Sequence, residues 1–124
     1  MTAAFLGLGR LEGIHRPAIA IPIPHAQGTT TVIDAGANVD CRPAYLAQFG
    51  VMGEVYAERV LGVAHPRIGL LNVGEEEGKG NELTQEAYAL LKASPLNFIG
   101  NVEGRDVANG SVDVIVCDGF VGNI

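Results

Sequence analysis

Short apolar segments with little polar alternation recur along the chain, and two longer segments with helical periodicity lie among them. β-Branched and aliphatic residues on both faces of a short segment are typical of strands buried on both sides of a sheet. The pattern predicts five such strands: AIAIPI (18–23), TTVIDA (30–35), RIGLLNV (67–73), LNFIG (96–100) and VDVIVC (112–117).

The two longer segments carry apolar residues at spacings of three and four, which predicts amphipathic helices. In residues 43–62 this stripe consists of Leu46, Phe49, Gly53, Tyr56 and Val60. In residues 81–93 it consists of Leu83, Ala87, Leu90 and Leu91. Pro43 fits the first turn of a helix, and Glu82 and Lys92 lie at the ends that the helix dipole favours for their charges. Strands that alternate with helices predict an α/β domain with a largely parallel sheet.

Residues 7–13, GLGRLEG, have the glycine spacing of a dinucleotide-binding loop. That loop works only where its last glycine enters a helix, and Pro17, Pro22 and Pro24 disfavour a helix here. We therefore expect no NAD binding through this segment. The preceding MTAAFLGLG is interpreted as the end of a helix with a glycine C-cap.

Composition and charge narrow the protein class. The 124 residues are 48% hydrophobic and 18% charged, which predicts one globular domain over residues 1–124. Eight Lys and Arg residues and a net charge of −6 argue against nucleic-acid binding. Cys41 and Cys117 are too few for a disulfide framework or a zinc site, and no charged-then-apolar leader opens the sequence. No apolar run approaches the ~20 residues of a membrane span. These features predict a cytoplasmic protein.

Glycine and polar residues follow four of the predicted strands: VIDAGAN (32–38), LLNVGEE (70–76), NFIGNVEGRD (97–106) and IVCDGFVGN (115–123). In open α/β sheets, ligands bind outside the carboxyl ends of the strands, where glycine lets backbone N–H groups approach an anion. One such glycine can simply form a tight turn. Four of these ends on one sheet predict a shared pocket.

The motifs VIDAGANVDC, GLLNVGEEEGKGNEL, NFIGNVEGRD and CDGFVGN, in this order, resemble the PlsX-type phosphate acyltransferases of bacterial phospholipid synthesis. The resemblance implies transfer of a fatty acyl group from acyl carrier protein to inorganic phosphate, with no metal or redox cofactor. It implies a Rossmann-like, three-layer α/β/α fold of the isocitrate/isopropylmalate dehydrogenase kind and a homodimer. This chain would be the central part of such a protein, and any peripheral membrane association would come from parts beyond it.

The chemistry of this reaction indicates candidate site residues. A phosphate nucleophile needs a cationic cradle rich in amides, and Lys79 lies between two glycines that leave room for it. By resemblance, Asn123 is the donor to the thioester carbonyl or its oxyanion. Candidate contacts with the phosphate or the pantetheine arm are Asn38, Gly78, Gly80, Asn81, Asn101 and Gly122.

The acidic triplet at 75–77 is interpreted as solvated loop charge, although one of these carboxylates could pair with Lys79 or Arg105. Metal binding by consecutive acids is weakly supported, and we expect no metal site. We expect Cys117 to be a packed core thiol and assign no role to the histidines.

Two other interpretations stay open. One is a phosphotransacetylase-like acyltransferase on a similar sheet; a decarboxylating-dehydrogenase-like enzyme is disfavoured because the sequence lacks a metal-binding aspartate cluster and a credible NAD loop. The other is a non-catalytic fragment. Phosphate-dependent release of free carrier thiol would distinguish the enzyme from the fragment.

Overall fold

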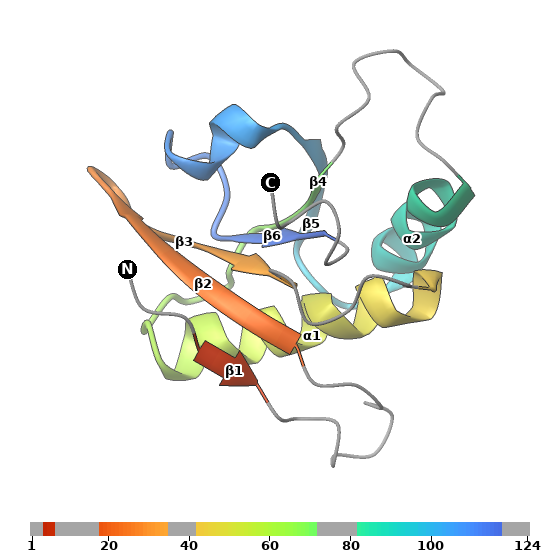
Figure 1. Ribbon diagram of the computed structural model, residues 1–124, viewed down its shortest axis with the longest axis horizontal. Coiled ribbons are helices and arrows are strands. Elements are labelled where there is room, and N and C mark those ends of the chain that lie inside the picture. The colour runs from red at the N-terminus through yellow and green to blue at the C-terminus, as the bar shows by residue number, and fades with distance from the viewer. Residues whose placement is uncertain (1–3, 7–17, 35–41, 72–81, 118–124) are drawn as a thin grey trace.

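The computed structural model describes residues 4–6, 18–34, 42–71 and 82–117 of the chain. Within these ranges six strands form one sheet, in the order β1-β2-β3-β6-β4-β5 (Figure 1). The strands are β1 (Ala4–Leu6), β2 (Ala18–His25), β3 (Gly28–Ile33), β4 (Ile68–Leu71), β5 (Phe98–Val102) and β6 (Val114–Val116). Neighbours among β1, β2 and β3 are antiparallel, whereas β3, β6, β4 and β5 run parallel. The predicted α/β fold with a largely parallel sheet is confirmed.

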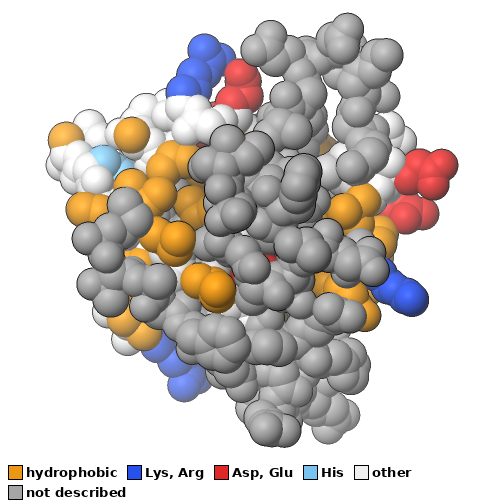
Figure 2. All heavy atoms as spheres, in the orientation of Figure 1, with side chains coloured by type: hydrophobic (Ala, Val, Ile, Leu, Met, Phe, Trp, Pro, Cys, Tyr) orange, Lys and Arg blue, Asp and Glu red, His pale blue; other side chains and the backbone are white. Residues whose placement is uncertain are grey.

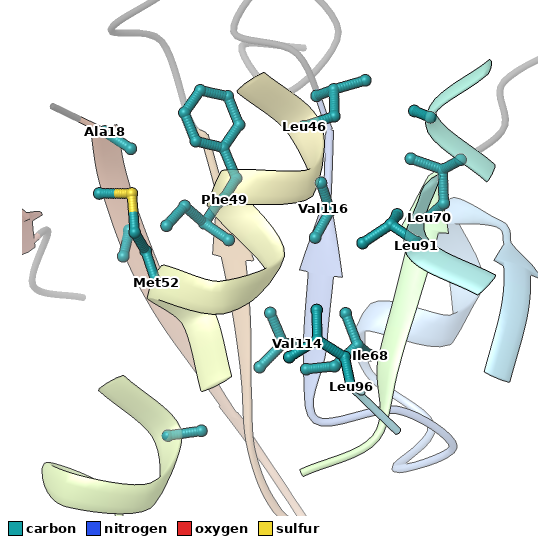
Figure 3. Close-up of a cluster of buried hydrophobic side chains, with 14 residues drawn as sticks. Ala18, Leu46, Phe49, Met52, Ile68, Leu70, Leu91, Leu96, Val114 and Val116 are labelled. Carbon is teal, nitrogen blue, oxygen red and sulfur yellow. The ribbon is translucent and has the colours of Figure 1, made fainter. Parts of the chain in front are cut away.

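Two helices, α1 (Pro43–Arg59) and α2 (Glu82–Ala93), contact each other and pack on one face of the sheet (Figure 1). The main hydrophobic core lies between these helices and the strands. Figure 3 shows Phe49 of α1 and Leu91 of α2 beside Val116 of the central strand β6. Side chains that alternate along a strand point to opposite faces, and this alternation gives β6 two buried sides.

The opposite face of the sheet carries a second, smaller cluster of Val102, Val112 and Ile115. Val107 packs against it from the short 3-10 helix η2 (Gly104–Val107). Helical segments therefore lie on both faces of the sheet within the described residues.

The interpretation of MTAAFLGLG as the end of a helix is wrong. Ala4–Leu6 forms strand β1, which pairs antiparallel with the start of β2 from Ala4↔Ala20 to Leu6↔Ala18. Alanine and leucine favour a helix in isolation, but the hydrogen bonds to a neighbouring strand override that local preference. Residues 7–17 therefore connect two antiparallel strands, whereas a dinucleotide-binding loop connects a strand to a helix.

The predicted buried stripes of the helices are partly wrong. Helix α1 ends at Arg59, and Val60 is 65% exposed. Leu90 of α2 is 44% exposed. The buried face of α1 also includes Met52 and Ala57, because this helix contacts both α2 and the sheet. Among the described residues, neither helix has the length and apolarity needed to cross a bilayer.

Candidate active site

The four parallel strands end at one edge of the sheet. Ile33 of β3, Val116 of β6, Leu70 of β4 and Asn101 of β5 are paired in register and form one row across it. With neighbouring strands about 4.8 Å apart, this row is about 15 Å long. Each of the four motifs singled out in the sequence contains one residue of this row. The described strand ends that belong to these motifs therefore lie along one edge of the sheet, as the sequence predicts.

One predicted site residue falls within the described ranges. Asn101 lies in β5, is exposed, and pairs in register with Leu70 at the carboxyl edge. The other predicted residues, Lys79, Asn123, Asn38, Gly78, Gly80, Asn81 and Gly122, lie outside the described residues, as does the acidic triplet at 75–77. Segment 72–81 continues from β4 and segment 118–124 follows β6, and these two strands are paired neighbours.

A hydrogen-bonded pair at this edge was not anticipated. Asp34 directly follows β3 and is fully buried, and its Oδ1 accepts a hydrogen bond from the backbone N–H of Ile19 at 3.0 Å. Cys117 directly follows β6 and is 2% exposed, as expected for a packed thiol. Its Sγ donates to the backbone oxygen of Asp34 at 3.3 Å. The sequence signal for Asp34 was only an acid directly after an apolar strand.

The charged groups just beyond β5 stabilise a turn. The carboxylate of Asp106 accepts hydrogen bonds from the backbone N–H of Glu103 at 2.8 Å and from the side chains of Asn109 and Ser111. These bonds hold the pKa of Asp106 below its ordinary value, and the bond from the Glu103 N–H has the largest effect. Arg105 pairs with Glu103 at 3.3 Å, and both side chains are exposed. Among the described residues, Arg105 therefore pairs with Glu103, and the predicted alternative, a pair with the triplet at 75–77, lies outside those residues.

The family model of the fatty acid synthesis proteins matches residues 1–124. The chain belongs to this family. A phosphate acyltransferase of Pelotomaculum thermopropionicum is 60% identical over all 124 residues, and one of Acidobacterium capsulatum is 61% identical over the same length. A phosphate acyltransferase of Aquifex aeolicus is 56% identical over 128 aligned residues. The chain spans 36%, 37% and 38% of the lengths of these three relatives.

A solved structure supports the fold of this family member. The EutD phosphotransacetylase from Staphylococcus aureus superposes on 99% of this chain and 40% of its own, with a TM-score of 0.59 and 16% sequence identity. At this identity the likeness shows a shared α/β fold.

The described part of this family member offers hydrogen-bonding groups at the edge but no cluster of three or more acidic, histidine or cysteine side chains that could hold a metal ion. Its buried groups there, Asp34 and Cys117, bond to backbone. The arrangement suits a site built from amides and loop residues around a row of strand ends.

Proposed function

We propose that the protein to which this chain belongs transfers a fatty acyl group from acyl carrier protein to inorganic phosphate, for phospholipid synthesis. A phosphate oxygen attacks the thioester carbonyl, the C–S bond breaks, and the products are acyl phosphate and the free carrier thiol. The observation that carries the proposal is the 60–61% identity, over the whole chain, to proteins named phosphate acyltransferase.

We place the reaction at the carboxyl edge of the parallel strands. Lys79 binds the phosphate, and Asn123 donates to the carbonyl oxygen as negative charge develops on it. Support for this pairing comes from β4 and β6, which are neighbours in register from Ile68↔Val114 to Leu70↔Val116 and lead into the two segments that carry these residues. Helix α2 begins at Glu82, and the positive end of its dipole favours an anion near Lys79.

The remaining proposed contacts bind the phosphate or the pantetheine arm of the carrier: Asn38, Gly78, Gly80, Asn81, Asn101 and Gly122. Glycines let backbone N–H groups approach an anion closely, and amide side chains can complete its coordination. We further propose that the protein is a cytoplasmic homodimer. The homodimer follows from the family resemblance, and the cytoplasmic location follows from the low cysteine content.

The test is an assay on the full-length protein with a long-chain acyl carrier protein substrate, with and without inorganic phosphate. Release of carrier thiol should require phosphate, and hydroxylamine should trap the product as acyl hydroxamate. Thiol release that is independent of phosphate, or that yields no hydroxamate, would overturn the proposal. A strong preference for acetyl-coenzyme A over acyl carrier protein would instead support the phosphotransacetylase-like alternative.

A further inference from the structure

We propose that Asp34 and Cys117 are positioning residues for the acyl transfer, because they fix where two site-bearing segments leave the sheet. Segment 35–41, which carries Asn38, begins directly after Asp34, and segment 118–124, which carries Asn123, begins directly after Cys117. The inference rests on the proposed function.

Two hydrogen bonds join Asp34 and Cys117, and a third joins Cys117 to Ile33, next to the last parallel pair, Ile33↔Val116. The backbone N–H of Asp34 donates to the oxygen of Cys117 at 3.0 Å, and the N–H of Cys117 donates to the oxygen of Ile33 at 2.9 Å. The thiol of Cys117 then donates to the oxygen of Asp34 at 3.3 Å. The strand pairing thus continues up to the residues from which both segments depart.

The carboxylate of Asp34 adds a contact with a third strand. The register of β2 and β3 runs through Ala20↔Ile33, which places Ile19 opposite Asp34, one position beyond the last pair. The Ile19 N–H donates to Oδ1 of Asp34 at 3.0 Å, so a side chain accepts the hydrogen bond that a longer β3 would have accepted. Asp34 is thereby held from β2 and from β6 at the same time.

These contacts favour a role in geometry over a role in stability alone. A thiol is a weak hydrogen-bond donor, so the Cys117 contact alone adds little to folding. Together with the backbone bond to Cys117 and the bond from the Ile19 N–H, it defines the position of Asp34 in a buried site. A misplacement of a catalytic group by about 1 Å can lower the rate by about 10²-fold. Both segments carry proposed substrate contacts and begin at the residue next to this pair, so we expect a shift of Asp34 or Cys117 to displace those contacts.

The test uses the full-length protein and compares Cys117→Ala with Cys117→Ser, which keeps a hydroxyl donor in place of the thiol. We expect Cys117→Ala to lower kcat by about tenfold or more, as a partial misplacement of a donor should. The KM for acyl carrier protein should change by a smaller factor than kcat, because a misplaced donor weakens transition-state binding more than substrate binding. Cys117→Ser should restore kcat to within about threefold of wild type, since the hydrogen bond to Asp34 is kept.

Thr30→Val is the matched control. Thr30 lies in β3, the strand that Asp34 follows, but toward the opposite end of that strand. The substitution removes a buried hydroxyl, which donates to the oxygen of Val112 at 2.9 Å. Its kcat should equal that of wild type even where its melting temperature falls more than that of Cys117→Ala. Equal loss of kcat in the two variants would show that destabilisation alone explains the effect.

Asp34→Asn and Asp34→Ala give a second comparison if Cys117→Ala does not fold. Asparagine keeps an oxygen acceptor for the Ile19 N–H, so Asp34→Asn should retain more kcat than Asp34→Ala by about tenfold. Wild-type kcat in Cys117→Ala or in Asp34→Ala would overturn this inference but leave the proposed function standing. Absence of phosphate-dependent acyl phosphate formation in the wild-type protein would overturn the proposed function and this inference with it.

Discussion

At the scale of single residues, two adjacent buried threonines of β3 differ in their hydrogen bonding. The hydroxyl of Thr30 donates to the oxygen of Val112 at 2.9 Å and contacts Nε2 of His25 at 2.9 Å. The Gln27 N–H donates to Nδ1 of His25, which leaves Nε2 as the protonated nitrogen that donates to Thr30. Thr31 is equally buried, and its Oγ1 has no hydrogen-bond partner among the described residues. A buried hydroxyl without a partner costs free energy, whereas a paired one does not.

The two threonines therefore predict opposite effects of the same substitution. Thr31→Val should raise the free energy of unfolding by about 1 kcal/mol, because it removes an unpaired buried hydroxyl. Thr30→Val should lower it by about 1–3 kcal/mol, because it leaves the oxygen of Val112 unpaired. Denaturant unfolding of the full-length protein measures both values. Equal destabilisation by the two variants would contradict this account.

Asp113 predicts how stability depends on pH. Burial opposes ionisation of this carboxyl. The hydrogen bonds from the side chain and the backbone N–H of Arg67, with the charge of Arg67, outweigh burial and hold the pKa of Asp113 below its ordinary value. A lowered carboxyl pKa stabilises the fold above the unfolded-chain value of about 3.9, and this contribution is lost as the pH falls through the folded-state pKa.

Asp113→Asn should therefore flatten the acid limb of the stability curve. Wild type should lose about 1 kcal/mol more than Asp113→Asn between about pH 5 and pH 2, a modest difference because Arg67 is 42% exposed. Unfolding measured across this range gives the two slopes. Glu103→Gln in the exposed pair with Arg105 is the control and should follow wild type. Parallel curves for wild type and Asp113→Asn would contradict the assignment.

At the scale of elements, glycines in α1 set how closely this helix approaches the sheet. A Cβ added to Gly53 would lie 2.5 Å from Cγ1 of Val114 in β6 and 3.3 Å from Cγ2 of Ile33 in β3. A Cβ at Gly50 would meet the ends of Leu91 and Leu96 at 2.9 and 3.0 Å, and these flexible side chains can move. Valine in a strand has few alternative rotamers and cannot move in the same way.

Gly53→Ala should destabilise the protein by about 1–3 kcal/mol through overpacking, despite the gain of up to about 1 kcal/mol in helix propensity. Gly50→Ala should change stability by less than about 1 kcal/mol, since the propensity gain offsets a small rearrangement. Thermal unfolding of both variants tests the pair. A higher melting temperature for Gly53→Ala than for wild type would show that α1 does not depend on this close contact.

The sequence predicted the parallel part of the sheet well because β3, β4, β5 and β6 are short, apolar and followed in the sequence by glycine and polar residues. It did not predict β1, whose three residues take their conformation from pairing with β2. Pro22 and Pro24 lie within β2, but β1 pairs only with Ala18–Ala20. The backbone N–H that each proline lacks is therefore not needed for a hydrogen bond to β1. Local patterns do not contain such pairing information.

Prediction of the candidate site was similarly uneven. Asn101 was expected at the carboxyl edge, and it lies there within the last two residues of β5, because the carboxyl ends of parallel strands meet at one edge of a sheet. The contact between Asp34 and Cys117 joins residues 83 positions apart in the sequence, and only the β3–β6 pairing brings them together. The roles of Lys79 and Asn123 stay predictions.

At the scale of the whole molecule, the described sheet has open edges and exposed apolar side chains. Strand β5 pairs with β4 alone within the described residues, and Ile99 of β5 is 45% exposed. Figure 2 shows further hydrophobic side chains at the surface over β2. The chain spans 36–38% of the length of the phosphate acyltransferases it matches, and longer family members have further residues with which to cover such surfaces.

The 124 residues in isolation should therefore associate in solution and show little or no acyl transfer. Light scattering measures the association, and the phosphate-dependent thiol assay measures the activity, with the full-length protein as the control. A monodisperse monomer with full activity would show that the rest of the relatives' length is dispensable for both properties.

The central claim, that phosphate binds at the carboxyl edge through Lys79, is tested most directly by comparing the two lysines of the chain in the full-length protein. Lys79→Ala should lower phosphate-dependent acyl phosphate formation by about 10²-fold without loss of stability. Lys92→Ala, in the exposed last turn of α2, should match wild type. Full activity in Lys79→Ala, or an equal loss in both variants, would contradict the claim.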